Sequence, residues 1–391
     1  DGVTEYNWTN TNTSIGLPSA GTGDIGSFSV VNTSTSAQSA TITVTPTYTN
    51  NGVICSGNSE QFTITVNPSA QVNGLADYNT ILCDGEFTPV YSFSTANTDG
   101  LTTFNWTNNN LAIGLADSGE GGIPSFQVTN STQSTISATI TVTPSYENNG
   151  IFCDGNAETF TITVNPSPEM DNVDDVVLCN NEISSIIEFT TPNTDGNTTY
   201  TWTNDNTSIG LSSTGNGDIP SFTALNLSPI TEVATITVTP TYENNGVVCI
   251  GDPQTFSISV LSEIEITGTT VDALDCNDPN SGNINITVTG GSGVYDFLWS
   301  NGAITEDLNN IGPGDYSVTV TDSEGCTAIS QTFNIFRQDD LTVELDTEIV
   351  PFCENNLVTQ ENRITISGGL GPYTVNWSGG SVSINDNTFM T

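Results

Sequence analysis

Apolar and polar residues alternate strictly in both halves of the stretch 138–166. Ile140 and Val142 alternate with threonines in the first half, and Ile162 and Val164 do so in the second. A period of two with β-branched residues is typical of a strand that buries one face. The pattern therefore predicts two long β-strands.

Turn-forming dipeptides separate these two strands. Asn149-Gly150 and Asp154-Gly155 tolerate the positive φ angles of tight turns, so we expect a long β-hairpin with Cys153 near its tip. The same hairpin pattern recurs at 40–68 and 234–262, and in another form at 315–335. The chain is therefore expected to be a string of modules, each closed by such a hairpin.

Tryptophans and cysteines fix the length of the repeat. Trp8, Trp106 and Trp202 are 98 and 96 residues apart, and a cysteine follows each of them after 47 residues. Helical periodicity is absent. About seven short strands per unit, with turn signals every 8–12 residues or so, indicate an all-β fold of immunoglobulin-like sandwiches. We predict a tandem array of such β-sandwich modules that forms an elongated rod.

The repeat divides the chain into five modules, numbered here in chain order. They are module one at 1–68, module two at 69–166, module three at 167–262, module four at 263–337 and module five at 338–391. The first and the last are expected to be incomplete, and the early cysteine of module one is expected before residue 1. The repeat type changes after Ser262. Prolines at 68, 166 and 168 predict short, stiff joints between the first three modules.

The charge balance excludes several classes of function. The chain has 44 acidic residues against two Lys or Arg, no histidine and a formal net charge of −42. Binding to nucleic acid or anionic lipid requires Lys and Arg, so we expect neither. Ser-His-Asp catalysis and histidine-ligated zinc need histidine, and Schiff-base chemistry needs lysine. No apolar run is long enough to span a bilayer, so no membrane insertion is expected in this segment. We predict that the protein is not an enzyme and binds no cofactor.

Acidic residues in turns are candidate calcium ligands, since Ca²⁺ prefers carboxylate oxygens. The candidates are Asp171, Asp174 and Asp175 beside a joint, Asp275 and Asp278 near Cys276, and Asp322 with Glu324. The alternative is that Asp and Asn simply populate turns, and no complete EF-hand-like loop is present.

One tryptophan per module is expected in the core. These residues are Trp8, Trp106, Trp202, Trp299 and Trp377, at the position where strand C of a sandwich carries its core aromatic. An exposed tryptophan that stacks on a sugar ring is the alternative.

The eight cysteines indicate an oxidising compartment, and three pairing schemes are open. Pairing within a module gives Cys83–Cys153, Cys179–Cys249 and Cys276–Cys326. A short-range scheme gives Cys55–Cys83 and its equivalents. A cross-joint scheme gives Cys83–Cys249 and Cys179–Cys326.

Strand direction favours the cross-joint scheme. The early cysteine precedes strand B at the downstream end of its sandwich, and the hairpin-tip cysteine lies at the upstream end. Within one module the two would be about 25 Å apart, whereas a disulfide needs a Cα separation of roughly 4.4–6.8 Å. The early cysteine of one module is therefore expected to meet the tip cysteine of the next, with within-module pairing as the alternative.

Two kinds of segment resemble known families. Residues 288–326 (VTGGSGVYDFLWSNG … DSEGC) closely resemble the SprB repeat of the gliding-motility adhesins of Bacteroidota. The motifs CDGE, NWTN, IPSF and FTITVNP of the first three modules resemble the PKD-like repeats of the same surface proteins. The resemblance implies PKD-like modules one to three, SprB repeats in modules four and five, and a very long cell-surface protein of the outer membrane.

The same resemblance implies partners and a role. Such proteins are exported by the type IX secretion system, are moved by the gliding machinery and grip a surface or polysaccharide. The leading hypothesis is a non-enzymatic adhesin shaft, roughly 150–200 Å long, whose direct partners are further repeats of the same chain and whose ligand site lies elsewhere. The alternative is a set of spacer or carbohydrate-binding modules of a secreted polysaccharide-degrading enzyme.

Overall fold

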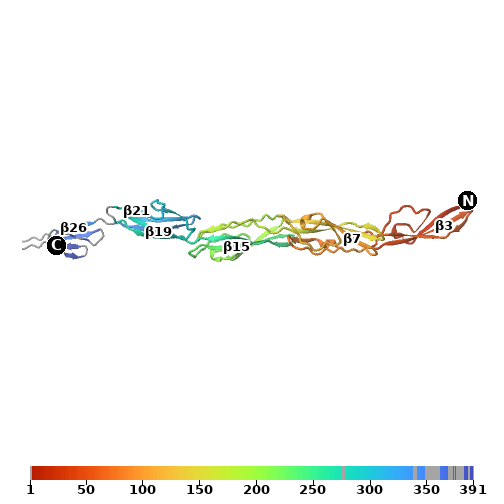
Figure 1. The fold of residues 1–391 in the computed structure, drawn as a ribbon, viewed down its shortest axis with the longest axis horizontal. Coiled ribbons are helices and arrows are strands. Elements are labelled where there is room, and N and C mark those ends of the chain that lie inside the picture. Colours follow the sequence, from red (N-terminus) through yellow and green to blue (C-terminus); the bar gives the residue numbers. More distant parts are fainter. Residues whose placement is uncertain are drawn as a thin grey trace, which may run out of the picture.

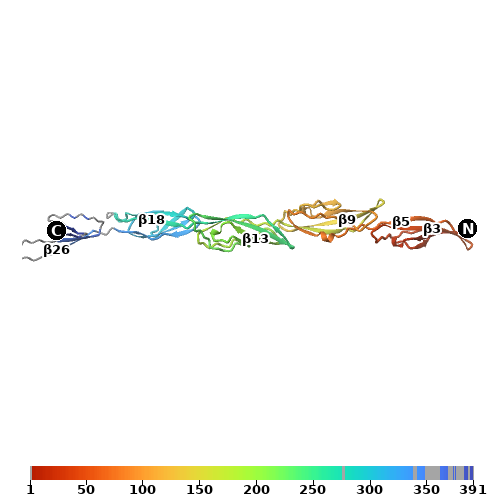
Figure 2. The same ribbon diagram turned by 90° about the horizontal axis from the view of Figure 1, so that it is seen from below.

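A computed structural model shows an elongated all-β array, in which the modules follow one another along a single axis (Figures 1 and 2). It describes residues 2–274, 278–337, 341–347, 362–368, 373, 375, 383–385 and 388–390. The colours in Figure 1 pass from red to blue along the long axis, so the described parts of the modules follow one another in the order of the sequence. The predicted fold class, a tandem array of immunoglobulin-like β-sandwiches that forms a rod, is confirmed.

Module two shows the common plan of the repeat. Its strands are β6 (Thr80–Cys83), β7 (Leu101–Asn108), β8 (Ser118–Glu120), β9 (Ile136–Asn148), β10 (Ile151–Asp154) and β11 (Glu158–Asn165). The sheet order is β6-β11-β9-β7-β8, with β10 also paired to β9. Strand β6 runs parallel to β11, whereas the neighbours within β11-β9-β7-β8 are antiparallel.

The hairpin that the alternation predicts is the centre of this sheet. Strands β9 and β10 are joined by Asn149-Gly150, whose φ angles of 53° and 77° are those of a type I′ turn. The end of β9 at 145–148 pairs with β10, and the part at 136–142 pairs with β11. Cys153 therefore lies three residues beyond the turn, at one end of the module.

Modules one and three repeat this arrangement. Module three consists of β12 (Val176–Leu178), β13 (Asn197–Asn204), β14 (Thr214–Asn216), β15 (Glu232–Asn244), β16 (Val247–Ile250) and β17 (Gln254–Val260). Module one has β1 (Val3–Asn10), β2 (Ala20–Thr22), β3 (Gln38–Asn50), β4 (Val53–Ser56) and β5 (Glu60–Val66). Four short 3₁₀ turns complete this part, η1 (Thr13–Ile15), η2 (Leu75–Tyr78), η3 (Leu111–Ile113) and η4 (Thr207–Ile209).

The second layer of modules two and three differs from the expected seven strands. It is formed by isolated bridges, such as Tyr91 with Ile123 in module two and Ile187 with Ile219 in module three. Pro89 and Pro124 interrupt the two segments of this layer in module two, and proline cannot donate a ladder hydrogen bond. Modules two and three therefore each have six continuous strands among their described residues, whereas the sequence predicts about seven.

Modules four and five have shorter strands. Module four contains β18 (Glu265–Val271), β19 (Gly282–Thr289), β20 (Tyr295–Trp299), β21 (Leu308–Ile311), β22 (Gly314–Tyr316), β23 (Val318–Asp322), β24 (Thr327–Ile329) and β25 (Phe333–Ile335). They form the sheets β18-β19-β21, β20-β23-β24 and β22-β25. The described part of module five is one sheet in the order β26-β27-β29-β28, built from β26 (Thr342–Thr347), β27 (Asn362–Ser367), β28 (Ser383–Asn385) and β29 (Thr388–Met390).

A separate hydrophobic cluster fills each of the first four modules. Trp8, Trp106, Trp202 and Trp299 are buried in these four clusters, whereas Trp377 lies outside the described residues. The indole N–H of Trp299 donates to the Thr305 carbonyl at 2.8 Å. Each tryptophan packs within a larger apolar cluster, which in module two also contains Tyr91, Phe104 and Phe160, and such large aromatics contribute much of the apolar area that a core buries.

A glycine faces the tryptophan ring in each of the first three modules. In module two, Gly119 of β8 is the cross-strand partner of Trp106, and a Cβ at residue 119 would lie 2.3 Å from the ring carbon Cζ2. Gly21 and Gly215 are placed in the same way against Trp8 and Trp202. The repeat therefore keeps glycine here to admit the indole.

Gly119→Ala is expected to lower the free energy of unfolding of module two by about 1–3 kcal/mol, because the added methyl group overpacks the core. Gly26→Ala is the control, since a Cβ at residue 26 meets nothing within 4 Å. Urea unfolding followed by hydrogen exchange in each module measures both effects. Equal stability of the two variants would contradict the packing argument.

Candidate functional site

Two disulfides link modules across their joints. Cys83 pairs with Cys249 and Cys179 pairs with Cys326, each with a Cα–Cα separation of 5.6 Å. This distance lies within the usual range for a disulfide. Each bond joins the early cysteine of one module to the hairpin-tip cysteine of the next, as in the cross-joint scheme of the sequence.

The alternative pairings are absent from the described residues. Cys83, Cys249 and Cys326 are already bonded across joints, so the within-module pairs Cys83–Cys153, Cys179–Cys249 and Cys276–Cys326 do not form. In modules two and three they fail because the two cysteines of one module lie at opposite ends of its sandwich. Cys55 and Cys153 are free thiols, and Cys276 and Cys353 lie outside the described residues.

A repeated glutamate fixes the backbone of each early cysteine. Cys83 ends β6, and its N–H donates to Oε2 of Glu86 at 2.8 Å. Cys179 follows β12 and donates to Glu182 Oε2 at the same distance. The parallel pairing of β6 with β11 places Cys83 opposite Asn165, at the end of module two that faces module three. The motif CDGE or CNNE thus directs the sulfur toward the next module.

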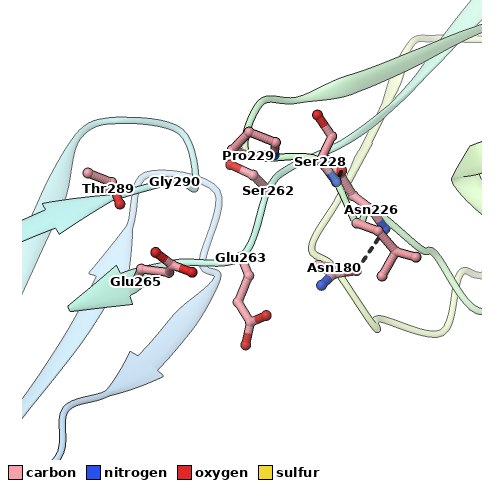
Figure 3. Close-up of a pocket in the computed structure, with 10 residues that line it drawn as sticks. Asn180, Asn226, Ser228, Pro229, Ser262, Glu263, Glu265, Thr289 and Gly290 are labelled. Atoms are coloured by element: carbon pink, nitrogen blue, oxygen red, sulfur yellow. Dashed lines mark hydrogen bonds between the residues drawn. The ribbon is translucent and has the colours of Figure 1, made fainter. Parts of the chain in front are cut away.

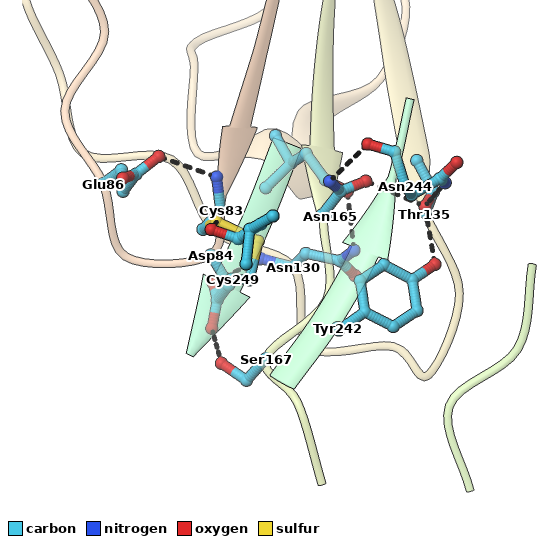
Figure 4. The surroundings of a disulfide bond; sticks show 12 residues. Cys83, Asp84, Glu86, Asn130, Thr135, Asn165, Ser167, Tyr242, Asn244 and Cys249 are labelled. Atoms are coloured by element: carbon cyan, nitrogen blue, oxygen red, sulfur yellow. Dashed lines mark hydrogen bonds between the residues drawn. A yellow bond between two sulfur atoms is a disulfide. The ribbon is translucent and has the colours of Figure 1, made fainter. Parts of the chain in front are cut away.

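Polar side chains surround the disulfide between modules two and three (Figure 4). Asn244 Nδ2 of module three donates to Thr135 Oγ1 of module two at 2.7 Å, and the Tyr242 hydroxyl lies 3.2 Å from the same oxygen. On the other side of the bond, Ser167 donates its hydroxyl proton to Asp84 Oδ2 at 2.8 Å. These contacts fix the orientation of the two modules in addition to the covalent link.

A second set of hydrogen bonds lies on the loop 133–135. The Thr194 N–H donates to the Gln133 carbonyl at 2.8 Å, and Gln133 Nε2 donates to Glu169 Oε2 at 2.9 Å. The residue pattern YENNG occurs at both hairpin tips, at 146–150 and 242–246. This repetition is the feature of the sequence that could have indicated a shared structural role for the two tips. The sequence analysis assigned none of these polar residues to the joint, because their partners lie in other modules.

The joint between modules three and four is more apolar around its cysteines. Cys326 is buried in the cluster of module four, and Cys179 of module three packs against that cluster. A crevice beside this joint is lined by Asn180, Asn226, Ser262, Glu263 and Glu265, among others (Figure 3). The Asn226 N–H donates to Asn180 Oδ1 at 2.8 Å. This hydrogen bond lies within module three and orders the side of the crevice that module three forms.

Several of the acidic candidates for calcium accept hydrogen bonds from other residues of their own module. Asp322 is buried, and its carboxylate accepts N–H groups from Ser292, Glu324 and Cys326 at 2.8–3.0 Å. Asp171 accepts from the Thr190 hydroxyl, and Asp278 accepts from the Asn280 N–H. Among the described residues, no group of three or more His, Cys, Asp or Glu side chains is placed to hold a metal ion. Asp275 lies outside the described residues.

Asp175 caps the edge of β17 with a charge. Its Oδ1 accepts the Ser257 N–H at 2.7 Å, and this hydrogen bond lowers the pKa of the Asp175 carboxyl. In module two the same position is Asn79, whose Oδ1 accepts the Thr161 N–H at 2.8 Å. The two modules thus use the same contact in a titratable and a neutral form.

Asp175→Asn is expected to keep the contact and remove its dependence on pH. Because the folded-state pKa is lowered, the carboxylate stabilises module three above the unfolded-state pKa, and this stabilisation is lost as the pH falls through the folded-state pKa. Urea midpoints of module three at neutral pH and at about pH 3 check this. The urea midpoint of Asp175→Asn should change less between the two pH values than that of the parent. Conversely, Asn79→Asp should make the urea midpoint of module two depend more strongly on pH than in the parent. The same change in variant and parent would contradict the assignment.

A family model matches one part of the chain. Residues 267–304 match the SprB repeat. This segment of module four is therefore similar to the SprB repeat. The match covers most of β18 together with β19 and β20 in module four, and it overlaps the segment 288–326 that showed the resemblance in the sequence. The resemblance to SprB-type adhesins is thereby confirmed.

No curated protein matches the chain. Among solved structures, the human desmocollin-1 ectodomain is 11% identical with a TM-score of 0.27, and the match covers 98% of this chain and 86% of that one. Repeats EC22–24 of mouse cadherin-23 are 12% identical with a TM-score of 0.30, covering 69% and 99%. Domains 3–5 of Drosophila OTK are 10% identical with a TM-score of 0.26, covering 70% and 98%. These similarities carry no inference about function. In the described part of the chain, no helix is long and apolar enough to cross a membrane.

Proposed function

We propose that this chain is a non-enzymatic shaft segment of a very large cell-surface adhesin. Its role would be reach and load transmission in surface attachment and gliding motility. The observation that carries the proposal is the pair of cross-joint disulfides in an array that includes a SprB repeat. A covalent link across a joint stops the two modules from separating or bending freely, and a shaft under tension needs such a link.

The wider setting belongs to the same proposal. The five modules, with the boundaries given above, would be three PKD-like sandwiches followed by two SprB repeats, exported by type IX secretion to the outer surface of a bacterium of the Bacteroidota. Their direct partners would be further repeats of the same chain. The adhesive site for a surface or polysaccharide, and the contact with the gliding machinery, would lie elsewhere in the protein.

The end-to-end length of single molecules tests the shaft. We expect the oxidised chain to appear in electron micrographs as a rod with a narrow spread of lengths, and the Cys83→Ser/Cys179→Ser variant to show bent particles and a broad spread. Cys55→Ser/Cys153→Ser is the control, because it removes only free thiols. Equal flexibility of the oxidised chain and the Cys83→Ser/Cys179→Ser variant would contradict a shaft role.

A glycan array addresses the alternative function. The proposal expects no specific binding of sugars by this segment. Specific binding that is lost on substitution of a surface aromatic would instead favour carbohydrate-binding modules of a polysaccharide-degrading enzyme.

A further inference from the structure

One loop of module three exposes apolar side chains where the repeat has polar ones. In the loop 226–231, Leu227 is 88% exposed and Ile230 is 69% exposed. Their counterparts in module two are Ser131 and Ser134, and module one also has hydroxyl side chains at both positions. Exposed apolar side chains that lie together are typical of a surface that a partner covers.

The backbone of this loop is the same in modules two and three. Asn226 is buried, and its Nδ2 donates to the carbonyls of Ile230 and Val260 at 2.8 Å each. Asn130 makes the same two hydrogen bonds in module two. Leucine and isoleucine are therefore not needed to shape the loop. Because the loop is already ordered, a partner that binds there has no loop-ordering cost to overcome.

The loop lacks its usual contact at the joint between modules three and four. In module two, the Gln133 carbonyl and Thr135 Oγ1 accept hydrogen bonds from module three. Their counterparts are Pro229 and Thr231, and among the described residues neither forms a hydrogen bond to module four. The crevice of Figure 3 lies at this place, and Leu227 and Pro229 are part of its wall on the side of module three.

The opposite wall of the crevice carries two carboxylates. Glu263 and Glu265 are exposed there, beside Thr289 (Figure 3). Leu261 and Ile264 are buried in the cluster of module four, so they fix the chain that carries the two glutamates. Residues two positions apart in an extended chain point to the same side, about 7 Å from each other. The wall therefore presents a fixed pair of negative charges.

This chain has no basic side chain that could neutralise the pair. Its two basic residues are Arg337 and Arg363. Arg337 forms a β-bridge with Ala273, beyond the end of β18 that is distant from the crevice, and Arg363 belongs to β27 of module five. A second copy of the chain, at a net charge of −42, is repelled from this surface. The occupant of the crevice must therefore be a different, positively charged molecule.

We propose that this crevice binds an extended segment of a partner protein, in which two Lys or Arg residues, two positions apart, are flanked by apolar residues. The basic side chains pair with Glu263 and Glu265. An apolar side chain covers Leu227 and Ile230, and its burial adds the affinity that two exposed ion pairs alone do not supply. The site goes beyond the shaft role, because it attaches a second protein to the side of the array where the two repeat types meet.

The probe is the blocked peptide Leu-Ser-Lys-Thr-Lys-Ser-Leu with a fluorescent label, titrated into the oxidised full chain. Leucine at both ends presents an apolar residue to the loop in either chain direction. We expect saturable binding of one peptide per chain by fluorescence anisotropy, with weaker binding at high salt. Amides of 226–231 and 263–266 should gain protection from hydrogen exchange. The same peptide with glutamine for both lysines should bind much more weakly.

Glu263→Gln/Glu265→Gln tests the charged wall and should weaken binding about fivefold, as expected for the loss of two exposed ion pairs. Its control is Glu120→Gln/Glu158→Gln in module two, which makes the same change in net charge at exposed residues away from the crevice. The control variant should bind as the parent does.

Leu227→Ser/Ile230→Ser tests the apolar wall. It introduces the residues of module two and should weaken binding about tenfold, because the partner's apolar side chain then has no apolar surface to cover. Its control is Leu101→Ser/Leu111→Ser, which removes two exposed leucines from module two and should bind as the parent does.

Four results would overturn the proposal. The first is parent-like affinity of either crevice variant, and the second is an equal loss of affinity in the module-two controls. The third is equally tight binding of the glutamine peptide, which would show that the partner's charge is not read. The fourth is self-association of the chain that Leu227→Ser/Ile230→Ser abolishes, because the occupant would then be a second copy.

Discussion

Pulled from its two ends in the oxidised state, the segment from Cys83 to Cys326 is expected to reach a contour length of only about 270 Å when it is completely unfolded. The reduced segment should reach about 850 Å. The shortest covalent path in the oxidised chain passes from Cys83 through its disulfide to Cys249, and then along roughly 77 residues to Cys326, instead of roughly 243. Single-molecule force spectroscopy measures both lengths.

The two disulfide-closed loops overlap between Cys179 and Cys249, so each bond protects against the loss of the other. Cys326→Ser should leave this unfolded contour length unchanged, because the path through Cys249 is intact. Cys249→Ser should raise it only to about 340 Å, since the path then runs from Cys83 to Cys179 and across to Cys326. With both substitutions together the unfolded segment should reach the full ~850 Å.

Cys249→Ser also separates this arrangement from pairing within modules. If Cys179 were bonded to Cys249 inside module three, that substitution would add about 70 residues, or about 245 Å, rather than about 65 Å. An increase of the larger size would contradict the cross-joint disulfides. The control is Cys55→Ser, which changes no disulfide and should leave every length as in the parent.

Because the two disulfide-closed loops overlap, tension can pass through the array along two covalent paths. Force that enters through β6 passes from Cys83 directly into the hairpin of module three, so the core of module two carries little of it. A second path enters module four through Cys179 and Cys326. A chain with both paths extends little even when individual sandwiches unfold, and unfolded modules remain held near their native neighbours. We expect this to favour refolding once the tension falls.

The sequence predicts the sandwich array and its joints because both depend on local, repeated signals. Alternation in 138–166 gives the strands, Asn149-Gly150 gives the turn, and strand direction alone places Cys83 and Cys249 at facing ends of adjacent modules. These features need no knowledge of which distant side chains touch. They therefore follow from one repeat unit and its spacing.

Features that depend on contacts between segments could not be predicted. Pro89 and Pro124 reduce the second layer to isolated bridges, although the apolar pattern there resembles that of strands. Asn108 is buried, and its side chain donates to the Leu115 carbonyl; composition suggested only that such residues populate turns. The hydrogen bond between Asn244 and Thr135 joins two modules. The residues around each of them form no pattern from which the partner in the other module could be predicted.

Trp106→Ala is expected to produce the largest loss of stability from a single substitution in module two, about 3–5 kcal/mol. Trp106 is 6% exposed, belongs to the module's hydrophobic cluster and faces Gly119. Its removal leaves a cavity that a thin, two-layer core closes poorly. Hydrogen exchange across a urea series, resolved by module, measures the effect without relying on tryptophan fluorescence.

Two further substitutions serve as comparisons for the stability loss of Trp106→Ala. Trp106→Phe should cost clearly less, because a ring remains and the indole N–H, which has no hydrogen-bond partner in module two, is removed. Trp8→Ala should also cost less than Trp106→Ala, since the described cluster around Trp8 is smaller. Equal costs of Trp106→Ala and Trp106→Phe would contradict this account of the core of module two.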